Sequence, residues 1–280
     1  MVLGLGSTRK SKAHEKRKMT KSINAVNKDV QIAIAFVDEL ELPKPPPRTR
    51  GVLSTETRNV FDETKNQAMV VGSDIVSFVA GITPELREAI VNCSLLAQLA
   101  ANRRVPTRED IRSWYEVYFD TLTHLGWATQ ERGFSEHRES GNDFEAHQAI
   151  LAIAAVILGP AATALAVVQT TLNAMKSMSD GPWMTIFNRE SQTAKAARFQ
   201  VTVAEPRTKG GAMISLMAFE LEAKRALTQV LFFKFRSTDV TLRHASGRVT
   251  VDTSMLEAVG PAIAKKVSAF TRNYVENLPI

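Results

Sequence analysis

Two glutamates, Glu220 and Glu222, stand two positions apart in a segment that we predict to be a strand, so their side chains share one face of it. Glu190 could approach the same face. A pair of carboxyl groups across a sheet can act as general acid and general base. Charged side chains on a strand more often face water, however, so we assign no catalytic residue. An enzyme with an unrecognised site stays an alternative.

Histidines and glutamates alternate in the polar, glycine-containing region between residues 124 and 147. Their spacing matches no zinc-binding motif such as H-E-x-x-H, and the chain contains no Walker A motif, no G-x-S-x-G motif and no EF-hand loop. We therefore interpret them as solvated loop residues and predict no metal and no cofactor. These residues are His124, Glu136, His137, Glu139, Glu145 and His147.

The single cysteine, Cys93, lies in a stretch of apolar residues with helical periodicity. One cysteine excludes an intramolecular disulfide. A small buried thiol is the simplest interpretation, and lipidation of Cys93 is the alternative that would matter for function.

The first 21 residues carry seven Lys or Arg side chains and one acid, Glu15, so this arm has the whole formal charge of the chain, +6. The remaining residues contain equal numbers of bases and acids. A basic arm attracts anionic surfaces, either phospholipid or nucleic acid. The cations are Arg9, Lys10, Lys12, Lys16, Arg17, Lys18 and Lys21.

Thirty consecutive residues, 146–175, carry no formal charge, and residues 149–168 are almost entirely Ala, Ile, Leu and Val. A helix that is apolar on all sides is buried in a core or in a membrane. Gly159-Pro160 divides the segment into two predicted helices, about 143–158 and 161–177, and neither alone reaches the roughly 20 residues that cross a bilayer. The large apolar side chains are Ile150, Leu151, Ile153, Val156, Ile157, Leu158, Leu165, Val167 and Val168.

The two predicted helices would form a hairpin, and their apolar composition favours a buried central element of a soluble domain. The functional alternative is a covered hairpin that leaves the fold and enters a bilayer. Helices predicted before it, over about 55–79, from Pro84 and from Pro106, could supply the cover.

Apolar and polar residues alternate in the last third of the 280-residue chain, which predicts antiparallel strands over 198–205, 213–221, 228–235, 240–244 and 249–251. A C-terminal helix follows Ser254. We thus predict an α+β fold in which helices precede a β-meander. The regions are residues 1–50 (arm, short helix and proline-rich linker), 51–180 (helices) and 181–280 (sheet and last helix), and the last two pack as one domain.

Three functions fit these features. We favour a non-enzymatic, toxin-like or virulence-like protein that binds anionic lipid through its arm and uses the apolar hairpin as effector or lipid-binding core. A self-associating, coat-like protein whose arm binds nucleic acid is the alternative, and an enzyme is the third. No signal peptide is visible, so the protein would be cytoplasmic or exported by another route, with a peripheral membrane location compatible with either.

Overall fold

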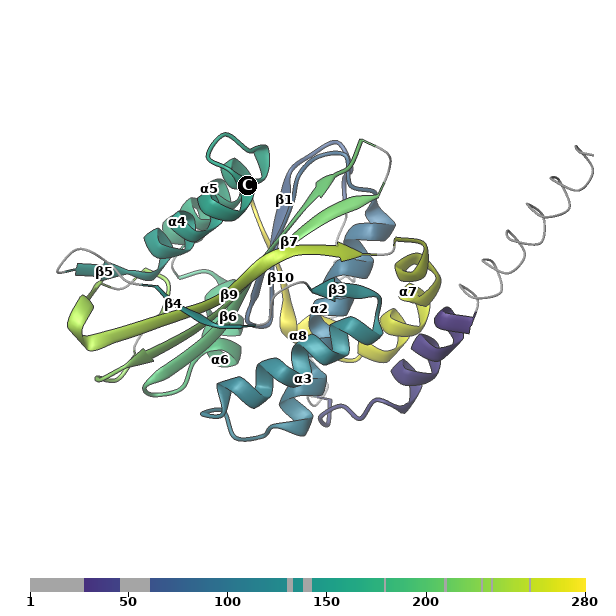
Figure 1. The fold of residues 1–280 in the computed structure, drawn as a ribbon, viewed down its shortest axis with the longest axis horizontal. Helices are drawn as coiled ribbons and strands as arrows, with labels where there is room; N and C mark the ends of the chain where they lie inside the picture. Colours follow the sequence, from purple (N-terminus) through teal and green to yellow (C-terminus); the bar gives the residue numbers. More distant parts are fainter. Residues whose placement is uncertain are drawn as a thin grey trace, which may run out of the picture.

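The computed structural model describes residues 28–45, 61–129, 133–137, 143–178, 180–208, 211–227, 229–232, 234–251 and 253–280. A mixed β-sheet lies between two layers of helices, which confirms the predicted α+β class (Figure 1). The strand order is β10-β1-β2-β6-β7-β9-β3, and β4 also pairs with β9. A separate ribbon pairs β5 with β8.

The strands are β1 (Gln67–Val71), β2 (Asp74–Phe78), β3 (Trp127–Thr129), β4 (Ser135–His137), β5 (Asp143–Glu145), β6 (Ala196–Pro206), β7 (Ala212–Ala223), β8 (Lys234–Arg236), β9 (Val240–Val251) and β10 (Val275–Leu278). The helices are residues 28–39, α2 (Pro84–Arg104), α3 (Ile111–His124), α4 (Ala146–Leu158), α5 (Thr163–Ser177), α6 (Pro182–Ser191), α7 (Thr253–Val267) and α8 (Thr271–Tyr274), with a 3-10 turn at Ser237–Asp239.

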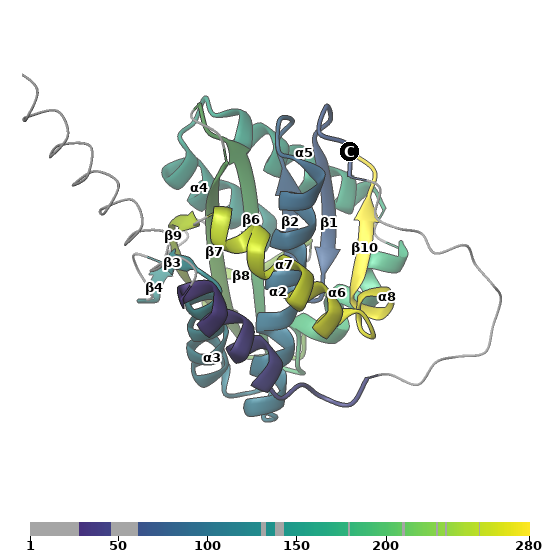
Figure 2. The same cartoon turned by 90° about the vertical axis from the view of Figure 1, so that its right-hand side faces the viewer.

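Two hydrophobic clusters fill the spaces on either side of the sheet. Helices α2, α3 and α7 and residues 28–39 cover one face, and α4, α5 and α6 cover the other (Figure 2). The long strands β6, β7 and β9 form an antiparallel meander, as the alternating sequence predicts. The β2–β6 pair is parallel, so the first strands join the meander through a different type of pairing.

The prediction of a helix through residues 61–79 is wrong: these residues contain the β1–β2 hairpin. Ala68, Val71, Ile75 and Phe78 have helical spacing, but both strands are buried on both faces. A strand without an exposed face is continuously apolar and does not alternate. Gly72, with a φ of +57°, allows the tight turn between them. The remainder of the predicted helix, residues 55–60, lies outside the described part.

The predicted central strand over 228–235 is also wrong. Val230 and Leu231 are buried, but they lie in an irregular segment, and only the three residues of β8 form a strand there. The two short strands predicted over 240–244 and 249–251 form one continuous strand, β9. β7 pairs directly with β9, so the predicted strand does not lie between them in the sheet. Leu227, Val230 and Leu231 of this segment instead pack into the core on one face of the sheet.

The helix boundaries agree more closely with the sequence. Thr83 caps α2 by accepting a hydrogen bond from the Leu86 amide at 3.4 Å, and Pro84 occupies the first turn. Helix α3 begins at Ile111, five residues after the predicted start, because Asp110 is its cap. The predicted apolar stripe of α3 is core: Ile111, Trp114, Tyr115, Tyr118, Phe119 and Leu122 are all buried.

Candidate functional site

Helices α4 and α5 form the predicted hairpin. Gly159 ends α4 with a φ of +96°, and its amide donates to the Ala155 carbonyl at 3.0 Å. Ala162 precedes α5, and no side chain caps the start of either helix. The two helices lie side by side across the sheet (Figure 1). The turn therefore brings two chain segments without formal charge against each other.

The inner face of the hairpin packs on the sheet through apolar side chains at helical spacing. One polar contact joins α5 to the sheet: the hydroxyls of Ser77 and Thr171 lie 3.2 Å apart. Because the Thr171 hydroxyl donates to the Val167 carbonyl at 2.8 Å, Ser77 is the donor of this pair. The buried apolar residues are Ala146, Ala149, Ile150, Ile153, Ala154 and Leu158 of α4, and Ala164, Val167, Val168, Leu172 and Met175 of α5.

The hairpin is buried against the sheet on its inner face, as predicted, and its outer face is exposed. Val156 is 86% exposed, more than the two other exposed large apolar side chains of the described residues, Ile32 and Ile280. We call the outer face the exposed residues of 146–175, which carry no formal charge: Gln148, Ala152, Val156, Pro160, Ala161, Thr163, Ala166, Gln169, Thr170 and Asn173. Exposed helix faces usually carry charged residues.

The nine large side chains predicted for the hairpin therefore divide into three groups. Ile150, Ile153, Leu158, Val167 and Val168 are buried against the sheet. Leu151, Ile157 and Leu165 are partly buried at the edges of the same cluster, and Val156 is exposed. The sequence predicted which residues belong to the hairpin but did not indicate which of them reach the surface.

Other predicted residues lie away from this surface or outside the described residues. The basic arm, Arg9 to Lys21, falls outside them. Cys93 is fully buried in α2, and burial raises the pKa of its thiol to about 12. A thiol with this pKa and no exposure is a poor nucleophile in the folded state. Lipidation of Cys93 stays a prediction, and it requires α2 to open or the reaction to precede folding.

The carboxylates considered for acid–base chemistry are held by arginines. Arg243 lies 3.6 Å from a Glu220 carboxylate oxygen and 3.1 Å from one of Glu222, through the same Nη1 atom. Burial raises the pKa of Glu220, while Arg243 opposes the shift. Glu190 instead pairs with Arg189 at 2.7 Å. The three acids therefore do not converge on a common site.

The histidines do not converge either. His124 contacts Asp120 at 3.7 Å and stacks on Phe36, whereas His147 lies at the start of α4. Among the described residues, no group of three or more His, Cys, Asp or Glu side chains is placed to hold a metal ion.

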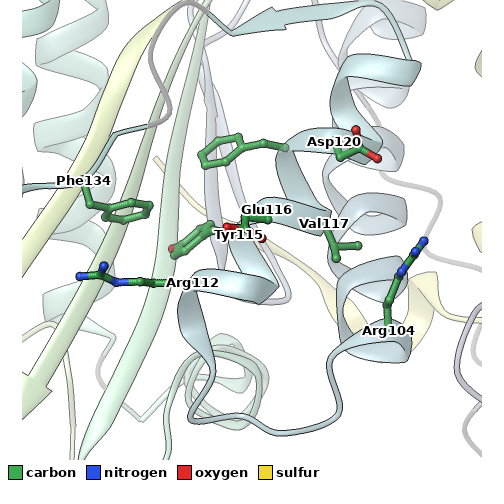
Figure 3. Close-up of a pocket in the computed structure, with 8 residues that line it drawn as sticks. Arg104, Arg112, Tyr115, Glu116, Val117, Asp120 and Phe134 are labelled. Atoms are coloured by element: carbon green, nitrogen blue, oxygen red, sulfur yellow. The ribbon is translucent and has the colours of Figure 1, made fainter.

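A surface cavity of about 690 Å³ lies over α3 (Figure 3). Its inner wall is aromatic, with Tyr115 and Phe119, and Phe134 closes one side at 5.0 Å from the Tyr115 ring. Its rim has two arginines and two acids, Arg104, Arg112, Glu116 and Asp120. Since the charges of both signs balance, the cavity does not indicate one chemical class of ligand.

A buried polar network beneath α2 was not predicted from the sequence. Asp74 in β2 is fully buried and accepts hydrogen bonds from Ser94 at 2.7 Å and Thr202 at 2.9 Å. Its other oxygen, Oδ1, has no partner among the described residues. Burial raises the pKa of Asp74 to about 6, although both hydroxyls lower it. The network contributes to the stability of the core and contains no accessible reactive group.

Within the described ranges, no helix has the length and apolar character to span a bilayer. No protein-family model matches the chain, and the search of curated proteins finds no match.

Three solved structures are similar to the chain in part. The virulence factor Evf aligns with 71% of this chain and 84% of its own, at 9% identity and a TM-score of 0.37. A delta-endotoxin aligns with 75% of this chain and 91% of its own, at 12% identity and a TM-score of 0.37. The activated Cyt2Ba monomer from Bacillus thuringiensis subsp. israelensis aligns with 63% of this chain and 96% of its own, at 14% identity and a TM-score of 0.29. These scores are too low to support an argument about function, which therefore rests on the surfaces described above.

Proposed function

We propose that this protein binds lipid bilayers and that the outer face of the α4–α5 hairpin is its contact surface. The observation that supports this proposal is the exposed surface without formal charge on two adjacent helices, which includes the 86% exposed Val156. Contact with lipid costs such a surface less than it costs a charged surface, because no charge is removed from water. A helix pair without a membrane-spanning length would lie in the interfacial region of the bilayer.

The basic arm would supply the second contribution to binding. Each Lys or Arg near an anionic membrane surface contributes about 1 kcal/mol at low salt. Burying one side chain of the size of valine contributes about 1.5–3 kcal/mol. The outer face alone would thus bind weakly, and the arm would give a preference for anionic lipid that decreases with salt concentration.

The proposal is tested by flotation of the protein with vesicles of neutral and of anionic phospholipid at low and high salt. Val156→Asp places a charge on the outer face, where the exposed side chain leaves room for it. We expect it to weaken binding about tenfold to a hundredfold, the loss that corresponds to the burial of one valine. Ile32→Asp is the matched control, because Ile32 is 54% exposed on another helix.

Two results would argue against this function. Equal binding by the Val156→Asp and Ile32→Asp variants would remove the outer face from the contact. A concentration-dependent mass in light scattering that Val156→Asp abolishes, without vesicle binding, would assign the same face to self-association. Toxin-like action is a separate step of the proposal, and it requires that bound protein releases a dye from the vesicles.

A further inference from the structure

A cluster of charged and titratable groups holds the start of α4 at the end of the hairpin opposite Gly159. His147 is in the first turn of α4 and is 8% exposed. Its backbone amide donates to the Leu231 carbonyl at 3.1 Å, and its ring lies 5.5 Å from that of Phe232. This histidine therefore joins α4 to the irregular segment between β7 and β8.

Two charged groups act on the His147 ring, Glu145 and Lys176, and a third, Lys234, pairs with Glu145. Glu145 of β5 places an oxygen 3.4 Å from the ring atom Nδ1, and its second oxygen lies 3.1 Å from the Lys234 ammonium of β8. Lys176, near the end of α5, is close enough to act on the ring electrostatically. Nδ1 itself has no hydrogen-bond partner among the described residues.

This arrangement suits a neutral histidine and disfavours a charged one. A proton on the ring would be buried, would lie near Lys176, and would sit at the positive end of the α4 dipole. Glu145 favours the proton, but it is already paired with Lys234. Accordingly, burial lowers the pKa of His147, Lys176 lowers it further, and Glu145 only reduces the shift.

From this geometry we infer that His147 is an acid-sensitive latch, which releases α4 from the fold when the pH falls below neutral, while the Glu145–Lys234 pair keeps β5 attached to β8. The functional consequence of this inference rests on the proposed function, because release would make the apolar inner face of the hairpin available to a bilayer. No described residue between Ala146 and Met175 carries a formal charge, so after the latch opens α4 is held by the apolar contacts of its inner face.

The direction of the pH dependence follows from linkage. A histidine whose pKa is lowered in the folded state binds its proton preferentially when α4 is open, so acid favours opening as the pH falls through the ordinary pKa of about 6.5. Burial would raise the pKa of Glu145, but the hydrogen bond and charge of Lys234 outweigh this, so its pKa lies below 4.5. The Glu145–Lys234 pair therefore persists while His147 titrates.

Amide hydrogen exchange tests the latch without lipid, so its failure is distinguishable from failure of the proposed function. We would measure exchange of residues 146–158 in the full-length protein at pH 7.4 and 5.5, corrected for the chemical exchange rate. We expect faster opening at pH 5.5, by up to about tenfold, because pH 5.5 lies one unit below the ordinary pKa of the ring. Residues 84–104 of α2 should not change.

Variants identify the group responsible. His147→Gln should abolish the acid-induced opening, whereas His124→Gln, at an exposed histidine, should retain it. Lys176→Gln is a second test at an exposed position that tolerates substitution, and it should weaken the acid response because it removes a charge that opposes protonation. Unchanged protection of wild-type α4 at pH 5.5, or an acid response in His147→Gln equal to that of wild type, would overturn the inference.

Discussion

Asp74 provides a quantitative test of the core as described. The carboxyl is fully buried and holds its proton up to a pH of about 6, whereas the ordinary pKa of the side chain is 3.8. Between these two values the folded protein binds a proton that the unfolded chain has released. The stability of the wild type therefore decreases as the pH rises from about 4 to about 6.

The size of this effect follows from the shift. A difference of about two pKa units corresponds to about 3 kcal/mol, fully expressed above pH 6 and absent below pH 4. Asp74→Asn keeps the shape of the side chain and an oxygen for Ser94 and Thr202, but it does not titrate. The free energy of unfolding of Asp74→Asn relative to wild type should rise by about 3 kcal/mol between pH 3.5 and pH 7.5.

Urea denaturation at a series of pH values measures this difference. Subtracting the profile of the variant from that of the wild type removes the contribution of all other groups that titrate. Asp120→Asn, at a carboxylate that is 63% exposed, is the control for the same substitution at the surface. Parallel profiles for wild type and Asp74→Asn would mean that the pKa of Asp74 is the same in the folded and the unfolded protein, so that burial does not raise it.

Further predictions concern the hairpin and the cysteine. Ile150→Ala removes a fully buried side chain between α4 and the sheet and should lower the free energy of unfolding by about 2–4 kcal/mol in urea denaturation, whereas Ala152→Ser on the exposed face should change it by less than about 0.5 kcal/mol. Equal effects of these two substitutions would contradict the assignment of inner and outer faces. Cys93 should resist iodoacetamide in the folded protein at pH 8 and react in urea, because its thiol is buried and its pKa is about 12. Rapid labelling of the folded protein would show that α2 opens readily.

The sequence predicted the parts of this fold whose signals are local. Thr83-Pro84 indicated the start of α2, Gly159-Pro160 indicated the turn of the hairpin, and the alternation around Phe199 and Val201 indicated β6. Each of these signals depends on a few neighbouring residues and on the backbone angles that they favour. Tertiary context did not alter any of the three.

The errors arose where burial depends on distant parts of the chain. β1 and β2 have no exposed face, because helices cover both sides of the sheet at its centre. Their sequence therefore lacks the alternation that distinguishes a strand from a helix. Similarly, Val230 and Leu231 are as apolar as strand residues, but β9 occupies the position beside β7 that they would have taken.

The candidate surface was predicted only in part. The absence of charge over 146–175 indicated an unusual element, and its helical hairpin is confirmed. Which face is exposed could not be derived, because Val156 and Ile153 are equally apolar and only the position of the sheet distinguishes them. The buried Asp74 network was missed for a related reason: Asp74, Ser94 and Thr202 are far apart in the sequence.

An environment-sensitive fluorophore at position 156 reports whether Val156 enters a bilayer. We would place the label on Val156→Cys in a Cys93→Ala background, with Ile32→Cys as the control on another exposed surface. We expect anionic vesicles to shift the emission of the label at position 156 to shorter wavelength, lipids with a quencher on the acyl chain to reduce it, and the label at position 32 not to respond. An unchanged emission at position 156 in vesicle-bound protein would show that Val156 stays outside the bilayer.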